Sequence, residues 1–374
     1  MQNLTDSRDG ALCVGLMSGT SLDGVDAVLM RFSDTAPPAF VAEATLPYPA
    51  EVRDAVLALQ AVDGNELDRA ARLGNRLAEL YAATVDALLA TAGVARDAVA
   101  VVGCHGQTIR HAPEKGYTLQ IGNLARLAEL CGIDVAGDFR SRDVAAGGHG
   151  APLVPAFHEA LFGHPDEARA ILNVGGIANL SRLSPGAPVI GFDTGPGNML
   201  MDAWTREQLG RDFDADGAWA ASGRVDAALL AALLAEPYFA APPPKSTGRD
   251  LFDLAWLQRH LAGREALSPA DVQATLLELT ATTIADALVR HAPATVELYV
   301  CGGGARNGAL MKRLAERLPA LRIDVTDALG LDSQQVEAAA FAWLGWRLLQ
   351  RKSGNLPAVT GAAGPRVLGA LYPR

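Results

Sequence analysis

The chain has little of three things that mark other classes of protein: cysteine, basic charge and long apolar runs. It contains four cysteines, Cys13, Cys104, Cys131 and Cys301, and none of them forms a C-x-x-C pair. Neither a zinc site nor a disulfide framework is therefore expected. Free thiols in a reducing compartment are the simpler interpretation.

Basic residues are outnumbered, with 32 Lys and Arg against 42 Asp and Glu, so the formal net charge is −10. Nucleic acid binding would favour a basic face, so we expect no nucleic acid partner. The same excess of negative charge repels anions. Any anionic ligand therefore needs a local positive pocket or a metal ion.

No apolar run reaches the roughly 18 residues of a membrane span. The opening stretch, MQNLTDSRDGALCVG, has acidic residues and lacks the apolar core of a secretory signal. We therefore expect a cytoplasmic protein with no membrane partner. The remaining composition, 49% hydrophobic and 20% charged, is ordinary for a folded enzyme. The length of 374 residues favours two domains.

Glycine is plentiful, and it follows predicted strands. Two strands at 12–17 and 25–32 enclose a polar loop, and a second pair within 168–183 encloses two glycines. Strands and helices alternate after each pair, which predicts an α/β protein of two halves with duplicated topology and a central cleft. Further strands are predicted at 38–46, 98–108, 117–122, 133–136, 188–198 and 296–300, and helices at 50–60, 66–92, 123–131, 224–236, 251–261, 269–291 and 334–350.

The first loop, GLMSGTSLDG, admits two interpretations. Its glycines let successive backbone N–H groups point at one anion, and Ser18, Thr20 and Ser21 add hydroxyl donors. Asp23 and Asp26 could hold Mg²⁺ or its waters. An ordinary hairpin turn is the alternative, because Asp-Gly is by itself a strong turn signal.

Two more glycine loops follow strands. In GFDTGPGN, Asp193 stands at the end of a strand, where catalytic carboxylates of open α/β sheets commonly lie, although it could instead cap the next helix. Gly195 and Gly197 allow a close backbone approach to a ligand. The third loop, CGGGARNG, could receive a nucleotide at a helix N-terminus. It is not G-x-G-x-x-G, so a dinucleotide-binding dehydrogenase is not expected.

The segment GDFRSRD offers Arg140 and Arg142, whose planar forks suit a carboxylate or phosphate. A surface salt-bridge pair with Asp138 and Asp143 is the alternative.

Other polar residues are candidates to line a pocket. His105 and Gln107 follow a buried strand, and Glu337 is the acid within an apolar, alanine-rich helix. The segment PPPKSTGRD lacks the glycines of a phosphate-binding P-loop. Its Lys245 and Arg249 either reach an anion or belong to a solvated linker.

Seven motifs in order, GLMSGTSLDGVD, GCHGQT, GDFRSRDVAAGG, NVGGIANLS, GFDTGPGN, PPKSTGRD and CGGGARN, resemble those of the anhydro-N-acetylmuramic acid kinase family. The resemblance covers about Val14 to Leu368. It implies the two-domain actin-like fold shared by sugar kinases, hexokinase and heat-shock chaperone ATPases. It also implies that ATP phosphorylates the 6-oxygen of 1,6-anhydro-N-acetylmuramic acid while water opens the ring, in peptidoglycan recycling. The alternatives are another sugar or carboxylate kinase of the same fold and, less favoured, an ATP-switched protein without catalysis.

The resemblance implies roles for particular residues. Asp193 is expected to be the catalytic base, and Arg140, Glu337, His105 and Gln107 are expected to contact the sugar. Mg²⁺ is expected at Asp23 or Asp26, because Met17 or Ser18 stands where such kinases usually carry an aspartate. The ATP contacts are expected at Gly19, Thr20, Ser21, Leu22, Asp23, Gly24, Val25, Asp26, Gly195, Gly197, Gly302, Gly303, Gly304 and Asn307.

The expected N-terminal lobe comprises 1–136 and 355–374, and the C-terminal lobe comprises 137–354. The expected partners are the amino sugar and ATP, with a homodimer left open.

Overall fold

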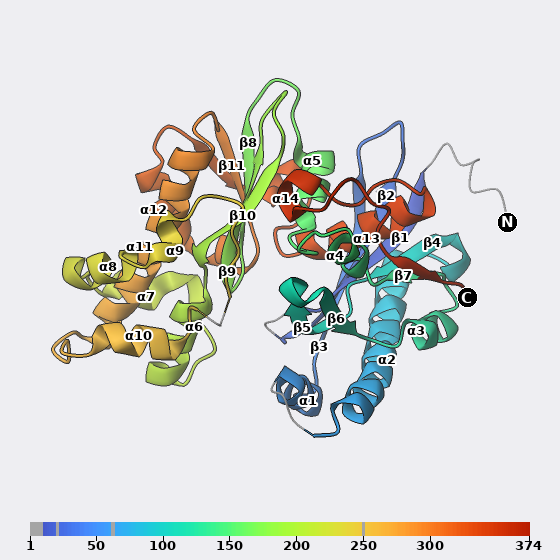
Figure 1. Cartoon of the computed structure of the whole chain (residues 1–374), viewed down its shortest axis with the longest axis horizontal. Helices are drawn as coiled ribbons and strands as arrows, with labels where there is room; N and C mark the ends of the chain where they lie inside the picture. Colours follow the sequence, from blue (N-terminus) through green and yellow to red (C-terminus); the bar gives the residue numbers. More distant parts are fainter. Residues whose placement is uncertain (1–9, 20–21, 61–63, 249–250) are drawn as a thin grey trace. The chain divides into compact units, whose positions relative to one another are not determined.

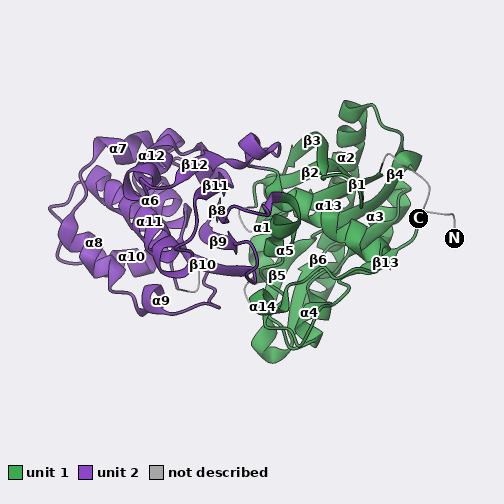
Figure 2. Ribbon diagram, turned by 90° about the horizontal axis from the view of Figure 1, so that it is seen from above, with its two compact units in different colours: residues 1–161, 335–374 green, residues 162–334 purple. Residues whose placement is uncertain are grey.

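The computed structural model describes residues 10–19, 22–60, 64–248 and 251–374. The chain forms two compact units, which Figure 2 draws in separate colours. Unit 1 consists of residues 1–161 and 335–374, and unit 2 consists of residues 162–334. The expectation about Thr20 and Ser21 lies outside the described residues, as does that about Arg249.

Unit 1 is built on a six-stranded sheet of order β13-β7-β4-β1-β2-β3 (Figure 1). The first three strands form an antiparallel meander, β4 and β7 run parallel to β1, and β13 closes the edge antiparallel to β7. A separate hairpin joins β5 and β6. The elements are β1 (Ala11–Met17), β2 (Gly24–Phe32), β3 (Ala39–Pro47), α1 (Ala50–Gln60), α2 (Glu66–Ala92), β4 (Val99–Cys104), β5 (Gln107–Ala112), β6 (Tyr117–Ile121), α3 (Leu124–Cys131), β7 (Val135–Gly137), α4 (Ser141–Ala145), α5 (Val154–Phe162), α13 (Val336–Leu349), α14 (Pro357–Thr360) and β13 (Ala370–Tyr372).

Two glycines let α13 lie directly on this sheet. Gly15 of β1 and Gly103 of β4 are paired in register. A Cβ on Gly15 would lie 1.9 Å from the carbonyl oxygen of Ala338, and one on Gly103 would lie 1.9 Å from that of Phe341. Only glycine therefore permits this approach, and the alanine-rich face of α13 supplies the matching small side chains.

The opposite face of the sheet packs on α2. Side chains alternate between faces along a strand, so Val14 and Leu16 point away from α13. They join a core that includes Leu77 and Tyr81 of α2. Unit 1 is thus a layered α/β/α body.

Unit 2 repeats the same sheet plan with order β10-β9-β8-β11-β12. Again the first three strands form an antiparallel meander, and the next two run parallel to the first. The predicted duplication of topology is confirmed. The elements are β8 (Arg169–Val174), β9 (Ile177–Leu183), β10 (Ile190–Pro196), α6 (Met199–Leu209), α7 (Ala218–Ser222), α8 (Ala227–Leu234), α9 (Pro237–Ala240), α10 (Leu254–Leu261), α11 (Pro269–His291), β11 (Glu297–Cys301), α12 (Gly308–Arg317) and β12 (Arg322–Val325).

Helix α11 is the centre of unit 2. By length and composition it could cross a membrane, contrary to our sequence expectation, but 89% of its most apolar window is buried inside the protein. It packs on α6, α7, α8 and α12 and on β10. Its apolar character is therefore that of a core helix. Its Thr280 hydroxyl lies 3.1 Å from the carbonyl oxygen of Pro196 and 3.0 Å from that of Gly197, which ties the end of β10 to the core.

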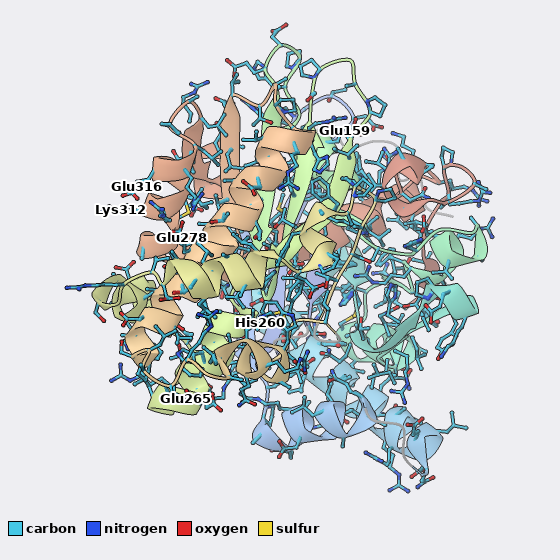
Figure 3. All side chains as sticks on the ribbon, turned by 60° about the vertical axis from the view of Figure 1, so that its left-hand side comes forward. Glu159, His260, Glu265, Glu278, Lys312 and Glu316 are labelled. Atoms are coloured by element: carbon cyan, nitrogen blue, oxygen red, sulfur yellow. The ribbon has the colours of Figure 1, made fainter. Side chains whose placement is uncertain are left out.

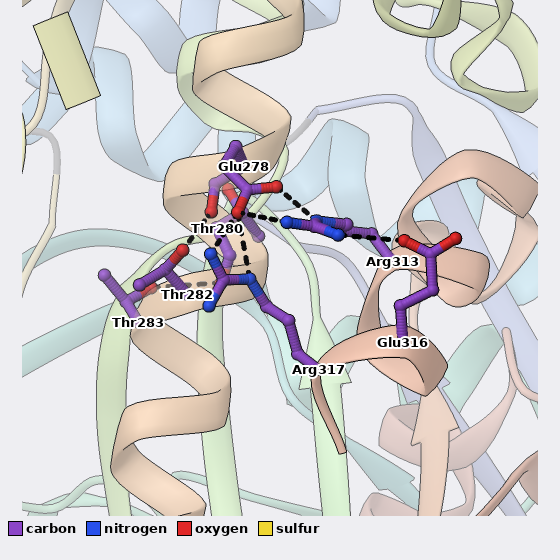
Figure 4. Close-up of polar contacts among 7 residues, drawn as sticks. All are labelled: Glu278, Thr280, Thr282, Thr283, Arg313, Glu316 and Arg317. Atoms are coloured by element: carbon purple, nitrogen blue, oxygen red, sulfur yellow. Dashed lines mark hydrogen bonds and ion pairs between the residues drawn. The ribbon is translucent and has the colours of Figure 1, made fainter. Parts of the chain in front are cut away.

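A charge cluster joins α11 to α12. The Glu278 side chain is 4% exposed and forms ion pairs with Arg313 and Arg317 (Figure 4). Its Oε1 accepts a hydrogen bond of 2.9 Å from Arg313 and one of 3.0 Å from Arg317. Lys312 and Glu316 lie on the exposed side of α12 beside it (Figure 3).

The compact units differ from the expected lobes at two boundaries. Residues 137–161 and 335–354 belong to unit 1, whereas the sequence interpretation assigned them to the C-terminal lobe. The reason is packing. Helix α13 covers β1 and β4, and α4 lies against β6, so both segments bury their apolar surface in unit 1.

Candidate functional site

Hydrogen bonds with other parts of unit 1 hold the loop between β1 and β2. The Ser18 hydroxyl lies 2.9 Å from the hydroxyl of Tyr81 and donates to the carbonyl of Gly106 at 3.0 Å. Gln107 is buried, and its amide donates to the carbonyl of Gly19 at 3.3 Å while its oxygen accepts from Tyr48 at 3.2 Å. The polar atoms of Gln107 are thus used to hold the loop.

Leu22 and Gly24 shape the C-terminal end of this loop, where it enters β2. Leu22 has a positive φ of 61° and is 3% exposed, so it anchors the loop in the core. A Cβ on Gly24 would lie 2.3 Å from the carbonyl oxygen of Leu46. Val25 is buried within β2. Of these expected ATP contacts, the side chains of Leu22 and Val25 face the core, and only the backbone is left to meet a ligand.

The two aspartates of the loop differ in their surroundings. Asp23 is exposed, and its carbonyl accepts the N–H of Tyr48 at 3.0 Å. Asp26 lies on β2, where its Oδ1 accepts the Thr45 hydroxyl at 2.7 Å. Among the described residues there is no group of three or more His, Cys, Asp or Glu side chains that could hold a metal. The exposed Asp23 carboxylate fits Mg²⁺ or its water shell better than Asp26 does.

Arg140 stands at the start of α4 with two hydrogen-bond partners. One guanidinium nitrogen donates to the carbonyl of Gly150 at 2.8 Å, and the other lies 3.0 Å from Nε2 of His105. Burial lowers the pKa of Arg140 to about 10, while Glu337 and Asp143 counteract the shift. Arg140 therefore remains a cation at neutral pH, electrostatically coupled to Glu337.

These contacts fix the tautomer of His105. Arginine can only donate, so Nε2 accepts, and Nδ1 must carry the proton that it donates to the carbonyl of Ser18 at 3.2 Å. Burial and the positive charge of Arg140 lower the pKa of His105 to about 3, so the ring is neutral. Both nitrogens of His105 are used, and the ring connects the first loop to Arg140.

The alternative of a surface salt-bridge pair in GDFRSRD is wrong for Asp143. Its side chain is fully buried and accepts from the backbone N–H of Gly150 at 2.8 Å, the amide of Asn355 at 2.6 Å and the hydroxyl of Thr360 at 2.8 Å. Asp143 thus fixes the loop that follows α4 against the C-terminal segment of unit 1. No local sequence pattern indicates this pairing, which spans more than 200 residues.

A cavity of about 230 Å³ opens beside His105 within unit 1. Thr118 and Gln120 of β6 line it, together with Asp138 and Ser141 at the start of α4. Leu119, Ile121 and Leu124 add apolar surface to this mainly polar lining, and the volume suits a small molecule.

In unit 2, three hydrogen bonds hold Asp193 at its place on β10. Its backbone N–H donates to the carbonyl of Lys245 at 3.1 Å, and its carbonyl accepts the Tyr238 hydroxyl at 2.8 Å. Its Oδ2 accepts the backbone N–H of Thr247 at 3.0 Å. Burial raises the pKa of Asp193 to about 6, although the N–H of Thr247 and the charge of Lys245 counteract the rise.

Lys245 is partly buried, and its ammonium is held within unit 2. Its ammonium donates to the carbonyl of Tyr238 at 3.1 Å and lies 4.6 Å from the centre of the Tyr238 ring. The segment PPPKST therefore packs beside the strand end of β10. Thr247 is a neighbour of Asp193 that our sequence reasoning did not identify.

The glycines after Asp193 allow the backbone conformation and the close backbone contacts of this turn. Gly195 has a φ of +151° and follows a bulge in the pairing of β10 with β9. The N–H of Gly197 donates to the carbonyl of Gly176 at 2.9 Å, and a Cβ on Gly197 would lie 2.4 Å from the carbonyl oxygen of Gly175. The amide of Gly197 is therefore used within unit 2, where it supports the turn between β8 and β9.

That turn, Gly175–Gly176, occupies the same place in unit 2 as the first loop does in unit 1. Each joins the first two antiparallel strands of its sheet. Gly176 is exposed. The signal was present in the sequence as the glycine pair of NVGGIANLS, but our sequence interpretation did not count it among the ligand contacts.

The third glycine loop follows β11. Gly302 has a φ of +79°, and a Cβ there would lie 2.3 Å from Oδ1 of Asn173. Gly304 is buried against Val174, whereas Gly303 is exposed. Asn307 caps α12 by accepting the N–H of Leu310 at 3.0 Å. Its side-chain oxygen is thus already engaged.

The chain is similar over nearly its full length to known proteins. A family model described as anhydro-N-acetylmuramic acid kinase matches residues 11–374. A relative of that name from Chromobacterium violaceum is 61% identical over 364 residues, covering 97% of this chain and 99% of the relative. Another of that name, from Pseudomonas paraeruginosa, is 58% identical and covers 96% and 98% of the two chains.

Among solved structures, the chain resembles component A of (R)-2-hydroxyglutaryl-CoA dehydratase from Acidaminococcus fermentans. The TM-score is 0.50 at 11% identity, with 90% of this chain and 98% of the other covered. This likeness concerns the fold alone, and it agrees with the repeated sheet order of the two units. Together with the family match, these observations establish that the chain has the actin-like ATPase fold and belongs to the anhydro-N-acetylmuramic acid kinase family of phosphotransferases.

Proposed function

We propose that this protein uses ATP and Mg²⁺ to phosphorylate the 6-oxygen of 1,6-anhydro-N-acetylmuramic acid while water opens the anhydro ring at carbon 1. The products are N-acetylmuramic acid 6-phosphate and ADP, and the reaction belongs to cytoplasmic peptidoglycan recycling. The relatives' names supply the substrate class. The observation that carries the chemistry is Asp193, a fixed carboxylate whose pKa is raised to about 6.

Asp193 acts as the base for the attacking water. A base with a pKa near 6 is mostly ionised at neutral pH and still accepts a proton readily. Attack opposite to the bridging oxygen inverts carbon 1. An inverting glycosidase uses a second carboxylic acid to protonate the leaving oxygen. Here the phosphoryl group captures that oxygen, so one carboxylate is sufficient.

Each unit offers one loop that we propose as a phosphate-binding loop. In unit 1 the loop is 18–23, and in unit 2 it is 175–176, supported by Gly197. Backbone N–H groups supply the local positive potential that a chain with a net charge of −10 otherwise lacks. Asp23 would hold Mg²⁺ or its waters, and Mg²⁺ when bound neutralises charge on the transferring phosphoryl group.

The nucleoside is proposed to lie on the loop Gly302–Gly304. Gly303 is the exposed member and offers its backbone at the loop surface. Asn307 would act indirectly, because it caps α12 and thereby fixes this loop.

The sugar is proposed to bind unit 1 near Arg140 and Glu337. A buried cation suits the lactyl carboxylate of the substrate. His105 and Gln107 would contribute by holding Arg140 and the first loop, since their polar atoms are engaged within unit 1.

A coupled assay for ADP release tests this function. It compares 1,6-anhydro-N-acetylmuramic acid with N-acetylmuramic acid and glucose at equal concentrations. We expect turnover to be highest with the anhydro sugar, and a preference for glucose would contradict the proposal. In ¹⁸O-labelled water the label should enter the sugar at carbon 1, whereas label in phosphate would indicate plain ATP hydrolysis.

A homodimer stays a prediction. Light scattering of the purified protein at several concentrations would measure its mass and decide between monomer and dimer.

A further inference from the structure

We propose that Thr247 is a positioning residue that holds the attacking water through its side-chain hydroxyl. This inference rests on the proposed role of Asp193 as the base. It starts from two atoms of one residue, the backbone nitrogen and Oγ1 of Thr247, which have different surroundings.

The backbone N–H of Thr247 selects one oxygen of the base. It donates to Oδ2 of Asp193 at 3.0 Å. Within the described part of the chain, Oδ1 has no hydrogen-bond partner, so it is the oxygen available to take a proton. The contact therefore fixes both the rotamer of Asp193 and the direction from which water must approach.

The hydroxyl of Thr247 is buried and has no hydrogen-bond partner among the described residues. A buried hydroxyl without a partner is unfavourable, and such an atom commonly marks the place of an ordered water. Three covalent bonds separate Oγ1 from the backbone nitrogen, so the two lie within about 4 Å of each other. Because that nitrogen is 3.0 Å from Oδ2 of Asp193, the unpartnered hydroxyl lies within about 7 Å of the carboxylate.

The segment that carries Thr247 is fixed along its length. The carbonyl of Lys245 accepts the N–H of Asp193 at 3.1 Å, and the ammonium of Lys245 donates to the carbonyl of Tyr238 at 3.1 Å. Tyr238 in turn donates its hydroxyl to the carbonyl of Asp193 at 2.8 Å. Thr247 and Asp193 therefore keep one relative geometry, as accurate positioning of a small nucleophile requires.

A single water satisfies both residues. It donates one hydrogen to Oδ1 of Asp193 and the other to Oγ1 of Thr247, which leaves a lone pair directed at carbon 1. In the reaction, the water oxygen bonds to carbon 1 and Asp193 takes the first proton. The bond from carbon 1 to the bridging oxygen breaks, and its electron pair stays on that oxygen. The oxygen then bonds to the γ-phosphorus as the bond to ADP breaks, and Asp193 later releases its proton to solvent.

The decisive comparison is Thr247→Val with Thr247→Ser. Valine keeps the shape of threonine and the backbone N–H but lacks the hydroxyl, whereas serine keeps the hydroxyl. We expect Thr247→Val to lower kcat on the anhydro sugar by about 10- to 100-fold and Thr247→Ser by less than about threefold, with the KM for ATP unchanged in both. Thr247→Ala repeats the removal with a smaller side chain if Thr247→Val does not fold.

Thr295→Val is the matched control. Thr295 is another threonine of unit 2 whose buried Oγ1 has no partner among the described residues, and no hydrogen bond within that part of the chain joins it to Asp193. Its substitution should leave kcat within about twofold of the unchanged protein, as expected where the hydroxyl has no part in the reaction.

A second readout is specific to water positioning. With methanol added as a competing nucleophile, Thr247→Val should form more methyl glycoside relative to hydrolysed product than the unchanged protein does. A purely structural role for Thr247 would not change this ratio.

Three results would overturn the inference: near-normal kcat in Thr247→Val, equal losses in the valine and serine variants, or an equal loss in Thr295→Val. The proposed function fails separately. It fails if the unchanged protein does not turn over the anhydro sugar, or if Asp193→Asn remains active. Activity of the unchanged protein together with an inactive Asp193→Asn and a fully active Thr247→Val would reject only the role of Thr247.

Discussion

At the scale of single residues, the surroundings of Asp193 set the pH range of the reaction. Burial raises the pKa of Asp193 from 3.8 to about 6, so its proton is lost only as the pH rises through that value. A general base must be ionised to act. We therefore predict that kcat/KM falls about tenfold per pH unit below pH 6, measured by ADP release between pH 4.5 and 8.

Asp193→Asn is the control for this pH dependence. The amide should cost at least about 100-fold in kcat, leave the KM for ATP within severalfold and abolish the acid limb. A profile that stays flat down to pH 4.5, or an active Asp193→Asn, would remove Asp193 from the role of base.

His105 offers a second prediction at this scale. Its ring accepts from Arg140 and donates to the carbonyl of Ser18, so it orients a charged group and a loop at once. We expect His105→Ala to raise the KM for the sugar by about tenfold, because Arg140 loses a fixed partner, with a smaller effect on the KM for ATP.

His111→Ala is the matched control for His105. His111 lies on the next strand and pairs with the hydroxyl of Thr118, so its loss should leave both KM values near normal. Equal kinetic effects of the two alanine substitutions would contradict a positioning role for His105.

At the scale of elements, two glycines decide how closely α13 approaches the sheet. A Cβ at Gly15 or Gly103 would lie 1.9 Å from a carbonyl oxygen of α13. Either alanine substitution forces backbone apart, and we predict a loss of about 3 kcal/mol in the free energy of unfolding. Urea unfolding followed by circular dichroism measures it.

At Gly74, in contrast to Gly15 and Gly103, there is room for a Cβ. It lies within α2, and a Cβ there would have its nearest neighbour at 3.5 Å, an ordinary contact. Gly74→Ala should therefore stabilise the protein by about 0.5–1 kcal/mol through helix propensity and a restricted unfolded chain. If all three alanine substitutions had the same effect, the close packing of α13 would not be the cause.

In the charge cluster between α11 and α12, removing the two arginines should cost more stability than removing the charge of Glu278 (Figure 4). Replacing Arg313 and Arg317 together by methionine leaves Glu278, which is 4% exposed, as a buried unpaired charge. This should cost about 3–5 kcal/mol. Glu278→Gln should cost only about 1–2 kcal/mol, because the arginine side chains are 37% and 26% exposed and can reach water. Thermal unfolding at pH 7 compares the stability of the double methionine variant with that of Glu278→Gln.

The same cluster makes stability depend on pH. Burial by itself would raise the pKa of Glu278, but its hydrogen bonds with the two arginines bring it below the ordinary value of 4.5. The stabilisation is therefore complete above pH 4.5 and is lost as the pH falls further. The difference in stability between the unchanged protein and Glu278→Gln should shrink in acid, and a constant difference would exclude this linkage.

At the scale of the whole molecule, the chain leaves unit 1 after α5 and returns to it with α13. Unit 1 is thus completed only after unit 2 has been made. Removal of residues 335–374 would strip the sheet of α13, which packs on β1, β2 and β4. We predict that a chain ending at Gln334 loses the cooperative unfolding transition of unit 1, seen by calorimetry. A transition of unit 1 that survives the truncation would contradict this account.

Much of the fold could be predicted from the sequence, because strands, helices and turns are recorded in local patterns. The strand pairs at 12–17 and 25–32 and within 168–183, and the helix 269–291, correspond to β1 and β2, β8 and β9, and α11. The lobe boundaries could not be predicted, because whether 137–161 and 335–354 pack in one unit or the other depends on long-range burial.

By itself, the sequence determined the family, the α/β class, the duplicated topology and the positions of the glycine loops, since each rests on residues that are neighbours along the chain. Only the tertiary structure decided which residues of the site are hydrogen-bonded to one another. It joined Asp193 to Thr247, His105 to Arg140, and Asp143 to Asn355 and Thr360. These pairs are separated by 35 to more than 200 residues, so no local pattern contains them. They form because the packed sheets and helices bring distant segments within hydrogen-bond distance.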